Sequence, residues 1–236
     1  MRIGLVSYRC KNRDLSFNLA QIQRAMQEAQ GKADLLCFGE AYLQGFDCLY
    51  WDYAADRELA LDMASAPVAQ LMQWTRQYHT ALLTGYIERE GDRLYSSCMV
   101  LAEGRLLHNY RRISKGWKEY WKTDEHYGEG TQVEPFCFQG KPITLTLCGD
   151  LWELPQRFKT DGLLIWPVYV NFSTAEWEQR ELANYAKQAS LAAKDVLMVN
   201  PIDLEPVNHG GSFHFQDGEI AARTPFDQEQ ILIVEL

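Results

Sequence analysis

The sequence has few features of a nucleic-acid-binding or membrane-bound protein. Its formal net charge is -9 over 236 residues, and Lys and Arg cluster only within the segment 111–122, where two tryptophans and one tyrosine interrupt them. Proteins that bind nucleic acids usually carry a basic stripe, so we expect no nucleic-acid partner. Every apolar run falls well short of the ~18 residues needed to span a bilayer, so we expect no membrane association.

Clustered cysteines and metal-ligand patterns are also missing. The six cysteines are scattered without a CxxC pair, and most lie within apolar runs. The apolar stretch that follows Met1 is too short for a signal peptide. We therefore expect reduced thiols and a cytoplasmic protein. His209 and His214 lie on a predicted strand at a spacing that places them on opposite faces, so no metal site is expected.

The chain does contain a succession of apolar runs, and 47% of its residues are hydrophobic. That is enough for one large core, and we find neither a repeat nor a linker, so we expect a single domain over residues 1–236. Apolar spacing predicts helices over 15–29, with Asp14 as N-cap, over 54–79, with a break near Pro67, and over 176–194. Strands are expected at 2–8, 33–40, 81–88, 94–102, 106–112, 142–148, 161–170, 196–200 and 230–236, with a hairpin over 210–224 that turns at Asp217-Gly218. This order indicates one mixed α/β domain with helices covering the sheet faces.

Three reactive side chains each follow a predicted strand: Glu40, Lys115 and Cys148. Catalytic groups in α/β folds gather at strand ends, where loops are exposed but firmly anchored. Taken singly, such a cysteine is more often buried filler, and such a glutamate or lysine is more often a surface group. Together they indicate nucleophilic catalysis, because a neutral thiol needs a nearby base and an oxyanion needs a cation.

Five segments extend this pattern over nearly the whole chain: ADLLCFGEAYLQGF, HNYRRISK, DEHYGEG, TLTLCGDLW, and GGSFHFQDGEI with the closing ILIVEL. In this order and spacing they resemble the nitrilase (carbon–nitrogen hydrolase) superfamily. The resemblance implies a four-layer α-β-β-α sandwich that forms a homodimer or larger assembly and needs no cofactor. It also implies hydrolysis of a non-peptide C–N bond in a small amide or carbamoyl compound, through a thioester.

The resemblance further implies the role of each candidate residue. Cys148 matches the nucleophile, Glu40 the general base, Lys115 the lysine of a Glu-Lys-Cys triad, and Glu125 a second glutamate that positions substrate and lysine. The backbone N–H of Gly149 is the expected second donor to the oxyanion. Candidate substrate-binding side chains are Trp117, Tyr120, Trp152, Tyr169 and Asn171.

The segment CGDLWELP departs from the family pattern, because glycine follows the cysteine where a larger residue is usual. We expect the missing side chain at Gly149 to enlarge or loosen the site. The tryptophans and tyrosines of 117–121 and 166–177 fit either a pocket wall or packing in a core or interface, and the sequence does not decide between them.

Other functions stay open at this point. One is a catalytically silent or regulatory protein on the same fold, and another is a glutaminase-like subunit that supplies ammonia to a partner. A Cys-His hydrolase is disfavoured, because no histidine lies in a nucleophile-elbow pattern. An ω-amide, a carbamoyl compound, glutamine and a nitrile all remain candidate substrates.

Overall fold

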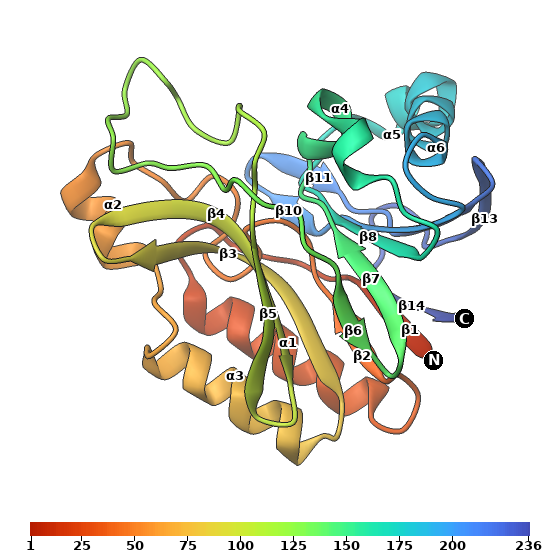
Figure 1. Ribbon diagram of the computed structural model, residues 1–236, viewed down its shortest axis with the longest axis horizontal. Coiled ribbons are helices and arrows are strands. Elements are labelled where there is room, and N and C mark those ends of the chain that lie inside the picture. Colours follow the sequence, from red (N-terminus) through yellow and green to blue (C-terminus); the bar gives the residue numbers. More distant parts are fainter.

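The computed structural model describes residues 1–236 as two six-stranded sheets packed face to face (Figure 1). The first sheet has the order β14-β1-β2-β3-β4-β5. Strands β1, β2 and β3 run parallel, and the other pairings in this sheet are antiparallel. Its strands are β1 (Arg2–Ser7), β2 (Leu35–Cys37), β3 (Ala81–Glu90), β4 (Arg93–Ala102), β5 (Arg105–Arg111) and β14 (Gln230–Glu235).

The second sheet has the order β13-β12-β9-β8-β7-β6, and its central strands β7, β8 and β9 are parallel. A separate two-stranded hairpin is formed by β10 and β11. The strands are β6 (Phe136–Phe138), β7 (Lys141–Leu145), β8 (Leu163–Pro167), β9 (Asp195–Val199), β10 (Ile202–Leu204), β11 (Val207–His209), β12 (Phe213–Gln216) and β13 (Glu219–Arg223).

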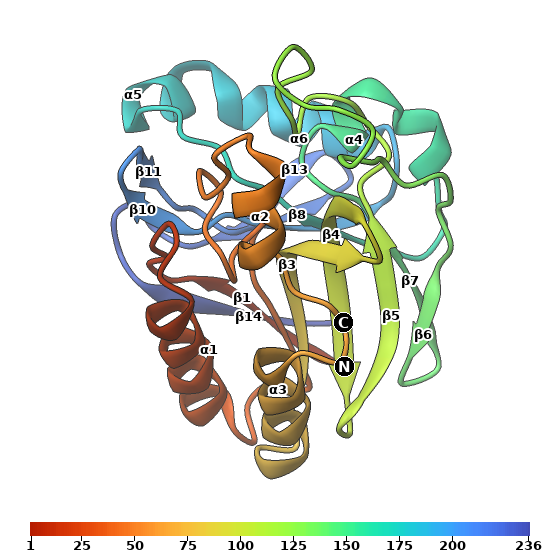
Figure 2. The same cartoon turned by 90° about the vertical axis from the view of Figure 1, so that its left-hand side faces the viewer.

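Helices cover the outer faces of both sheets. Figure 2 shows α1 and α3 below the first sheet and α4, α5 and α6 above the second, so the layers run helix, sheet, sheet, helix. The predicted α/β sandwich is therefore confirmed. The helices are α1 (Leu15–Ala29), α2 (Tyr53–Leu59), α3 (Ala66–Gln77), α4 (Asp150–Glu153), the 3-10 helix η1 (Pro155–Phe158), α5 (Thr174–Glu176), the π-helix η2 (Trp177–Glu181) and α6 (Leu182–Ser190).

Strand alternation divides the core into two main parts. Leu35 and Cys37 of β2 belong to the cluster that the first sheet shares with the second. Leu36 and Phe38 point the other way, into the cluster that includes α1 and α3. This period of two is what a strand buried on both faces requires, because successive side chains point to opposite sides of the sheet.

Several element boundaries differ from those predicted. Helix α1 matches 15–29, and Asp14 caps it by accepting a hydrogen bond from Phe17 N at 3.0 Å. The helical region predicted over 54–79 is broken as expected: α2 ends at Leu59, and α3 starts at Ala66, so that Pro67 lies in its first turn, where the missing N–H costs nothing. The helix predicted over 176–194 instead starts at Thr174, passes through the π-turn η2 and ends at Ser190. The strands β6, β10 and β11 were not predicted: each has three residues and, unlike β2 of the same length, does not lie within a longer apolar run.

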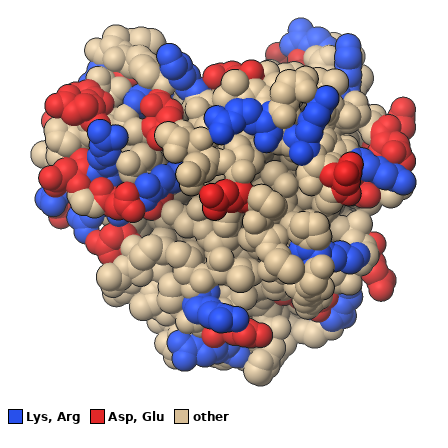
Figure 3. All heavy atoms as spheres, in the orientation of Figure 1, with Lys and Arg blue, Asp and Glu red and all other residues tan.

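The two ends of the chain meet, and the Met1 amino group donates to Leu236 O at 3.0 Å. On the face shown in Figure 3, basic and acidic side chains are interspersed. None of the helices is both long and apolar enough to cross a membrane.

The ends of strands from both sheets meet near one another, and this brings the candidate residues together. Glu40 follows β2, and its N–H donates to Val168 O, just beyond β8, at 3.2 Å. Cys148 follows β7, and its N–H donates to Pro167 O at the end of β8, at 2.9 Å. These two bonds place a residue of the first sheet beside a residue of the second.

Candidate active site

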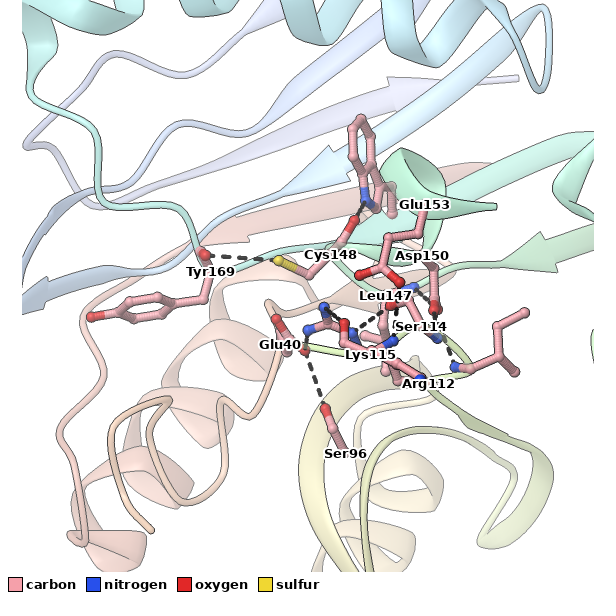
Figure 4. Close-up of polar contacts among 12 residues, drawn as sticks. Glu40, Ser96, Arg112, Ser114, Lys115, Leu147, Cys148, Asp150, Glu153 and Tyr169 are labelled. Atoms are coloured by element: carbon pink, nitrogen blue, oxygen red, sulfur yellow. Dashed lines mark hydrogen bonds and ion pairs between the residues drawn. The ribbon is translucent and has the colours of Figure 1, made fainter. Parts of the chain in front are cut away.

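Cys148 occupies a sharp turn between β7 and α4. Its φ is 42°, in the left-handed region, which costs a non-glycine residue about 1–2 kcal/mol. Backbone bonds hold the turn: the N–H donates to Pro167 O, and the carbonyl accepts from Trp166 Nε1 at 2.9 Å. The Sγ atom lies 3.9 Å from Tyr169 O (Figure 4). The turn thus places the thiol beside Glu40, at the margin of the core between the sheets.

Glu40 lies in the environment expected of a general base. Its side chain is 1% exposed, and its Oε1 accepts hydrogen bonds from Ser96 Oγ at 3.1 Å and Arg112 Nη1 at 2.9 Å (Figure 4). The other oxygen, Oε2, is buried without a partner. Gly85 allows this approach, because a Cβ there would lie 2.7 Å from Glu40 Cα. One carboxylate oxygen is therefore fixed, and the other is free to accept a proton.

Arg112 supplies the positive charge next to Glu40. It is buried, and the Nη1–Oε1 ion pair to Glu40 measures 2.9 Å. Its Nε donates to Ser114 Oγ at 2.8 Å, and its Nη2 donates to Lys115 O at 3.2 Å. These bonds use three of the five N–H groups of a guanidinium. The remaining two N–H groups have no acceptor in the protein.

Gly149 makes room for this guanidinium. A Cβ built on Gly149 would lie 2.3 Å from Arg112 Nη2, a separation that real Cβ atoms essentially never show. The sequence-based expectation that this glycine enlarges the site is therefore wrong, because the arginine side chain fills the space. The N–H of Gly149 has no hydrogen-bond acceptor in the protein, so it is also free for a ligand.

Asp150 ties the two halves of the site together. The carboxylate is fully buried. Its Oδ1 accepts from Ile113 N at 3.1 Å and Ser114 N at 2.7 Å, and its Oδ2 accepts from Leu147 N at 2.9 Å and from the Tyr110 hydroxyl. These bonds join the segment after β5, which carries Arg112, to the end of β7, which carries the nucleophile turn.

The electrostatics favour a protonated thiol and a permanently charged arginine. Burial raises the pKa of the Cys148 thiol to about 12; the Glu40 carboxylate adds to the increase, and the Arg112 guanidinium partly opposes it. Burial alone would lower the pKa of Arg112, but the charges of Glu40 and Cys148 raise it above its ordinary value. The thiol therefore has to lose its proton during its reaction, and Arg112 does not supply one.

This balance predicts opposite shifts in the reactivity of Cys148. In Glu40→Gln the pKa of the thiol falls, because a neighbouring negative charge is lost; in Arg112→Met it rises, because the opposing positive charge is lost. Each change of one unit in the pKa of the thiol changes the thiolate fraction about tenfold. At pH 9 we expect iodoacetamide to modify Cys148 faster in the first variant and more slowly in the second, measured by peptide mass spectrometry. Shifts in the same direction in both variants would contradict the electrostatic assignment.

Two of the sequence-predicted residues lie elsewhere. The side chain of Lys115 is exposed, and its Nζ lies 5.8 Å from the Tyr120 ring centroid, while only its backbone contacts Arg112. Glu125 is exposed in the turn after Asp124. The structure thus brings Glu40, Cys148 and Gly149 together but places Arg112, not Lys115, between the two reactive groups.

A signal for Arg112 was present in the sequence. Side chains alternate along a strand, and Tyr110 faces the core between the sheets. Arg112 follows Tyr110 by two residues, immediately after the end of β5, and so continues the alternation to the same side, whereas Lys115 lies further along in the irregular segment. Ser96 carried no comparable signal, because serine is common on any strand face.

The candidate substrate-binding residues are dispersed around the site. Tyr169 is buried, stacks on Phe46 with ring centroids 4.3 Å apart, and donates from its hydroxyl to Asp203 Oδ2 at 3.1 Å. Trp117 is buried with an unpartnered Nε1, in a small cluster that includes Ala41. The other three, Tyr120, Trp152 and Asn171, are exposed.

The aromatic residues left open between pocket and core divide clearly. Trp166 and Trp177 are fully buried, and both pack against Tyr185 of α6. Trp121 is 81% exposed. No group of three or more His, Cys, Asp or Glu side chains is placed to hold a metal ion.

Comparison with known proteins identifies the family of this chain. A family model described as carbon-nitrogen hydrolase matches residues 2–236. An (R)-stereoselective amidase from a Pseudomonas species is 26% identical over 157 residues, which are 66% of this chain and 54% of that protein. A glutamine-dependent NAD(+) synthetase from Thermotoga maritima is 24% identical over 157 residues, which are 65% of this chain and 26% of that protein. The matched regions thus span about half and about a quarter of these two relatives.

Solved structures share the fold at low sequence identity. A CN-hydrolase superfamily protein from Xanthomonas campestris superimposes with a TM-score of 0.78 and 18% identity, covering 99% of this chain and 89% of that one. A variant of the amidase from Nesterenkonia sp. AN1, with the acetamide moiety of fluoroacetamide added covalently at its active-site cysteine, gives a TM-score of 0.81 and 19% identity, covering 100% and 90%.

Proposed function

Because the chain belongs to the carbon–nitrogen hydrolase family, we propose that it hydrolyses the C–N bond of a small amide or carbamoyl compound through a thioester on Cys148. The observation that carries the proposal is the arrangement of two buried charged groups around the partly buried thiol of Cys148. A free carboxylate oxygen of Glu40 and a fixed Arg112 guanidinium lie beside a strained thiol.

The first half of the reaction forms the thioester. The Cys148 sulfur attacks the carbonyl carbon, and its proton passes to Glu40, whose Oε2 has no other partner. The carbonyl oxygen becomes an oxyanion, stabilised by Arg112 and by the Gly149 N–H. The C–N bond then breaks. Glu40 gives the proton to the departing nitrogen, because a guanidinium with a raised pKa does not release one.

The second half of the reaction releases the acid. Water attacks the thioester carbon while Glu40 takes its proton, and the same two donors stabilise the second oxyanion. The C–S bond breaks, and Glu40 returns the proton to Cys148. In this scheme Arg112 takes the place that the family resemblance gave to Lys115. Its function is electrostatic only, so all proton transfers depend on Glu40.

An acyl-trapping screen tests the proposal. The panel contains linear amides, carbamoyl compounds and L-glutamine, the last because one relative is a glutamine-dependent synthetase. We expect the wild-type protein to release ammonia or an amine from at least one compound. Wild-type protein quenched in acid during turnover should carry an acyl mass increase on Cys148, and Glu40→Gln should lose turnover, since its carboxamide accepts a proton neither from Cys148 nor from water.

The control is Cys148→Ala, which should neither release ammonia nor gain mass. Two results together would indicate the catalytically silent alternative. One is the absence of product from every compound. The other is the absence of an acyl mass increase on Cys148 in the acid-quenched wild-type protein with every compound.

The assembly and the compartment belong to the same proposal. We infer a homodimer or larger assembly and a cytoplasmic location from the family resemblance and from the free cysteines. Light scattering of the purified chain tests the assembly, and a monomer at micromolar concentration would refute it.

A further inference from the structure

The peptide between Cys148 and Gly149 is held by a residue that no family resemblance assigns. Trp166, the fourth residue of β8, donates from Nε1 to the Cys148 carbonyl at 2.9 Å. The next residue, Pro167, accepts from Cys148 N at 2.9 Å. The dipeptide Trp166–Pro167 therefore fixes both sides of the left-handed nucleophile turn.

Because the peptide group is planar, the hydrogen bond at the Cys148 carbonyl also determines the orientation of the Gly149 N–H. In a trans peptide the C=O and the following N–H point in opposite directions. Holding the Cys148 carbonyl on the indole therefore fixes the direction of the Gly149 N–H. That N–H has no acceptor within the protein, as expected of a donor reserved for a ligand.

We propose that Trp166 is a positioning residue that aims the Gly149 N–H at the oxyanion. The inference rests on the proposed function, because it gives that N–H a catalytic task. It accounts for a tryptophan, rather than another large apolar residue, at this place: phenylalanine would fill much of the same volume but could not hold the carbonyl.

The indole is itself rigidly placed. Trp166 is fully buried, and its ring stacks on Tyr185 of α6, with centroids 5.2 Å apart and an interplanar angle of 24°. Trp152 of α4 packs against the same two rings, at 6.2 Å and 5.0 Å. The direction of the Nε1–H bond is therefore set by packing across β8, α4 and α6, and a fixed donor is what a preorganised oxyanion site needs.

Trp177 provides a matched control. It is also fully buried and packs against Tyr185, with centroids 5.1 Å apart. Its Nε1 has no hydrogen-bond partner, so Trp177→Phe removes an indole from the same aromatic cluster without releasing a carbonyl. A purely structural contribution of Trp166 would make the two phenylalanine variants alike.

The kinetic test compares Trp166→Phe with Trp177→Phe, using an amide that the wild-type protein hydrolyses. We expect kcat to fall about ten- to a hundredfold in Trp166→Phe, less than the full loss of an oxyanion donor, with KM within about twofold. Iodoacetamide modification of Cys148 should stay within about twofold of wild type, because a displacement at carbon forms no oxyanion. Trp177→Phe should keep the wild-type kcat. Equal kcat values in the two variants, or alkylation that falls in parallel with kcat, would overturn the inference.

A spectroscopic test does not depend on activity. Cys148–Gly149 is the one Cys–Gly pair in the sequence, so combined carbonyl-¹³C cysteine and ¹⁵N glycine labelling gives a single correlation for this peptide. We expect the Cys148 carbonyl ¹³C resonance to move upfield in Trp166→Phe, where the hydrogen bond is lost, and to stay in place in Trp177→Phe. If the wild-type protein hydrolyses no amide, the proposed function fails, and the resonance still decides the positioning: an unmoved carbonyl overturns it.

Discussion

An alanine at position 149 is expected to lower kcat/KM about a hundredfold when residue 112 is arginine, and by less than about threefold when residue 112 is lysine. The backbone does not oppose the substitution, because Gly149 has φ -63° and ψ -18°, which any L-residue adopts. The obstacle is Arg112 Nη2, at 2.3 Å from the new Cβ. Alanine must therefore displace the guanidinium, whereas a shorter lysine side chain has no atom to displace.

Displacing the guanidinium is costly because its other contacts are buried. Movement of Nη2 breaks its bond to Lys115 O and disturbs the ion pair with Glu40. The oxyanion then loses the nearby cation, and a hundredfold loss corresponds to about 2.7 kcal/mol of transition-state stabilisation. Alanine keeps the backbone N–H at position 149, so we assign the loss in kcat/KM to the displacement of Arg112 alone.

Four proteins measure this coupling: wild type, Gly149→Ala, Arg112→Lys and the double variant. Steady-state kinetics on one amide gives the interaction energy, and thermal denaturation shows whether each protein is folded. The Arg112→Lys variant keeps the charge and serves as the reference for alanine without a steric conflict. An equal loss from alanine in both backgrounds would show that Gly149 acts independently of Arg112.

The sequence predicted that Glu40 and Cys148 lie close together, because each follows a buried strand and the ends of such strands lie near one another. Glu40 comes after β2 and Cys148 after β7, and apolar runs before them marked both strands. The alternation of apolar strands with helical stretches also predicted a mixed α/β domain. Short elements escaped prediction: β6, β10 and β11 each have three residues and lack the longer apolar run that marked β2.

The structure places Arg112, and not the side chain of Lys115, beside Glu40, and there is a physical reason why the sequence did not predict this. Lys115 lies in an irregular segment after β5, where no periodicity fixes the direction of a side chain. Arg112 is identified by alternation with Tyr110 and by a packing relation with Gly149, a residue far away in the chain. The bond from Trp166 to the Cys148 carbonyl likewise spans 18 residues. Such contacts join residues that are distant in the chain, and a local sequence pattern does not show which distant residues meet.

Replacement of Asp150 is expected to destabilise the fold and the site together. Its carboxylate accepts three backbone N–H groups and the Tyr110 hydroxyl, all buried. An unpaired buried donor costs about 1–3 kcal/mol, so Asp150→Ala should lose about 4 kcal/mol or more of the free energy of unfolding. That is a large part of the total stability of a typical domain, about 5–15 kcal/mol. Asp150→Asn, which keeps one acceptor oxygen, should lose less and remain folded.

Asp56 matches Asp150 in burial and hydrogen bonding but lies in another part of the fold. It is also fully buried, and it accepts from Tyr50 N at 2.7 Å, Trp51 N at 3.0 Å and the Tyr127 hydroxyl at 2.7 Å. Asp56→Asn should therefore lower the free energy of unfolding in urea by an amount similar to Asp150→Asn. It does not touch the segment that carries Arg112, so the alkylation rate of Cys148 should stay near that of the wild-type protein.

The two asparagine variants separate fold stability from site assembly. Asp150 holds Ser114 N and Leu147 N on one carboxylate, so its loss releases the Arg112 segment from the nucleophile turn. Any retreat of Arg112 removes the positive charge that opposes the increase in the pKa of Cys148. The alkylation rate at pH 9 should therefore fall in Asp150→Asn but not in Asp56→Asn. If both rates fall with stability, Asp150 is a structural residue only, and the position of Arg112 depends on its own bonds to Glu40 and Ser114.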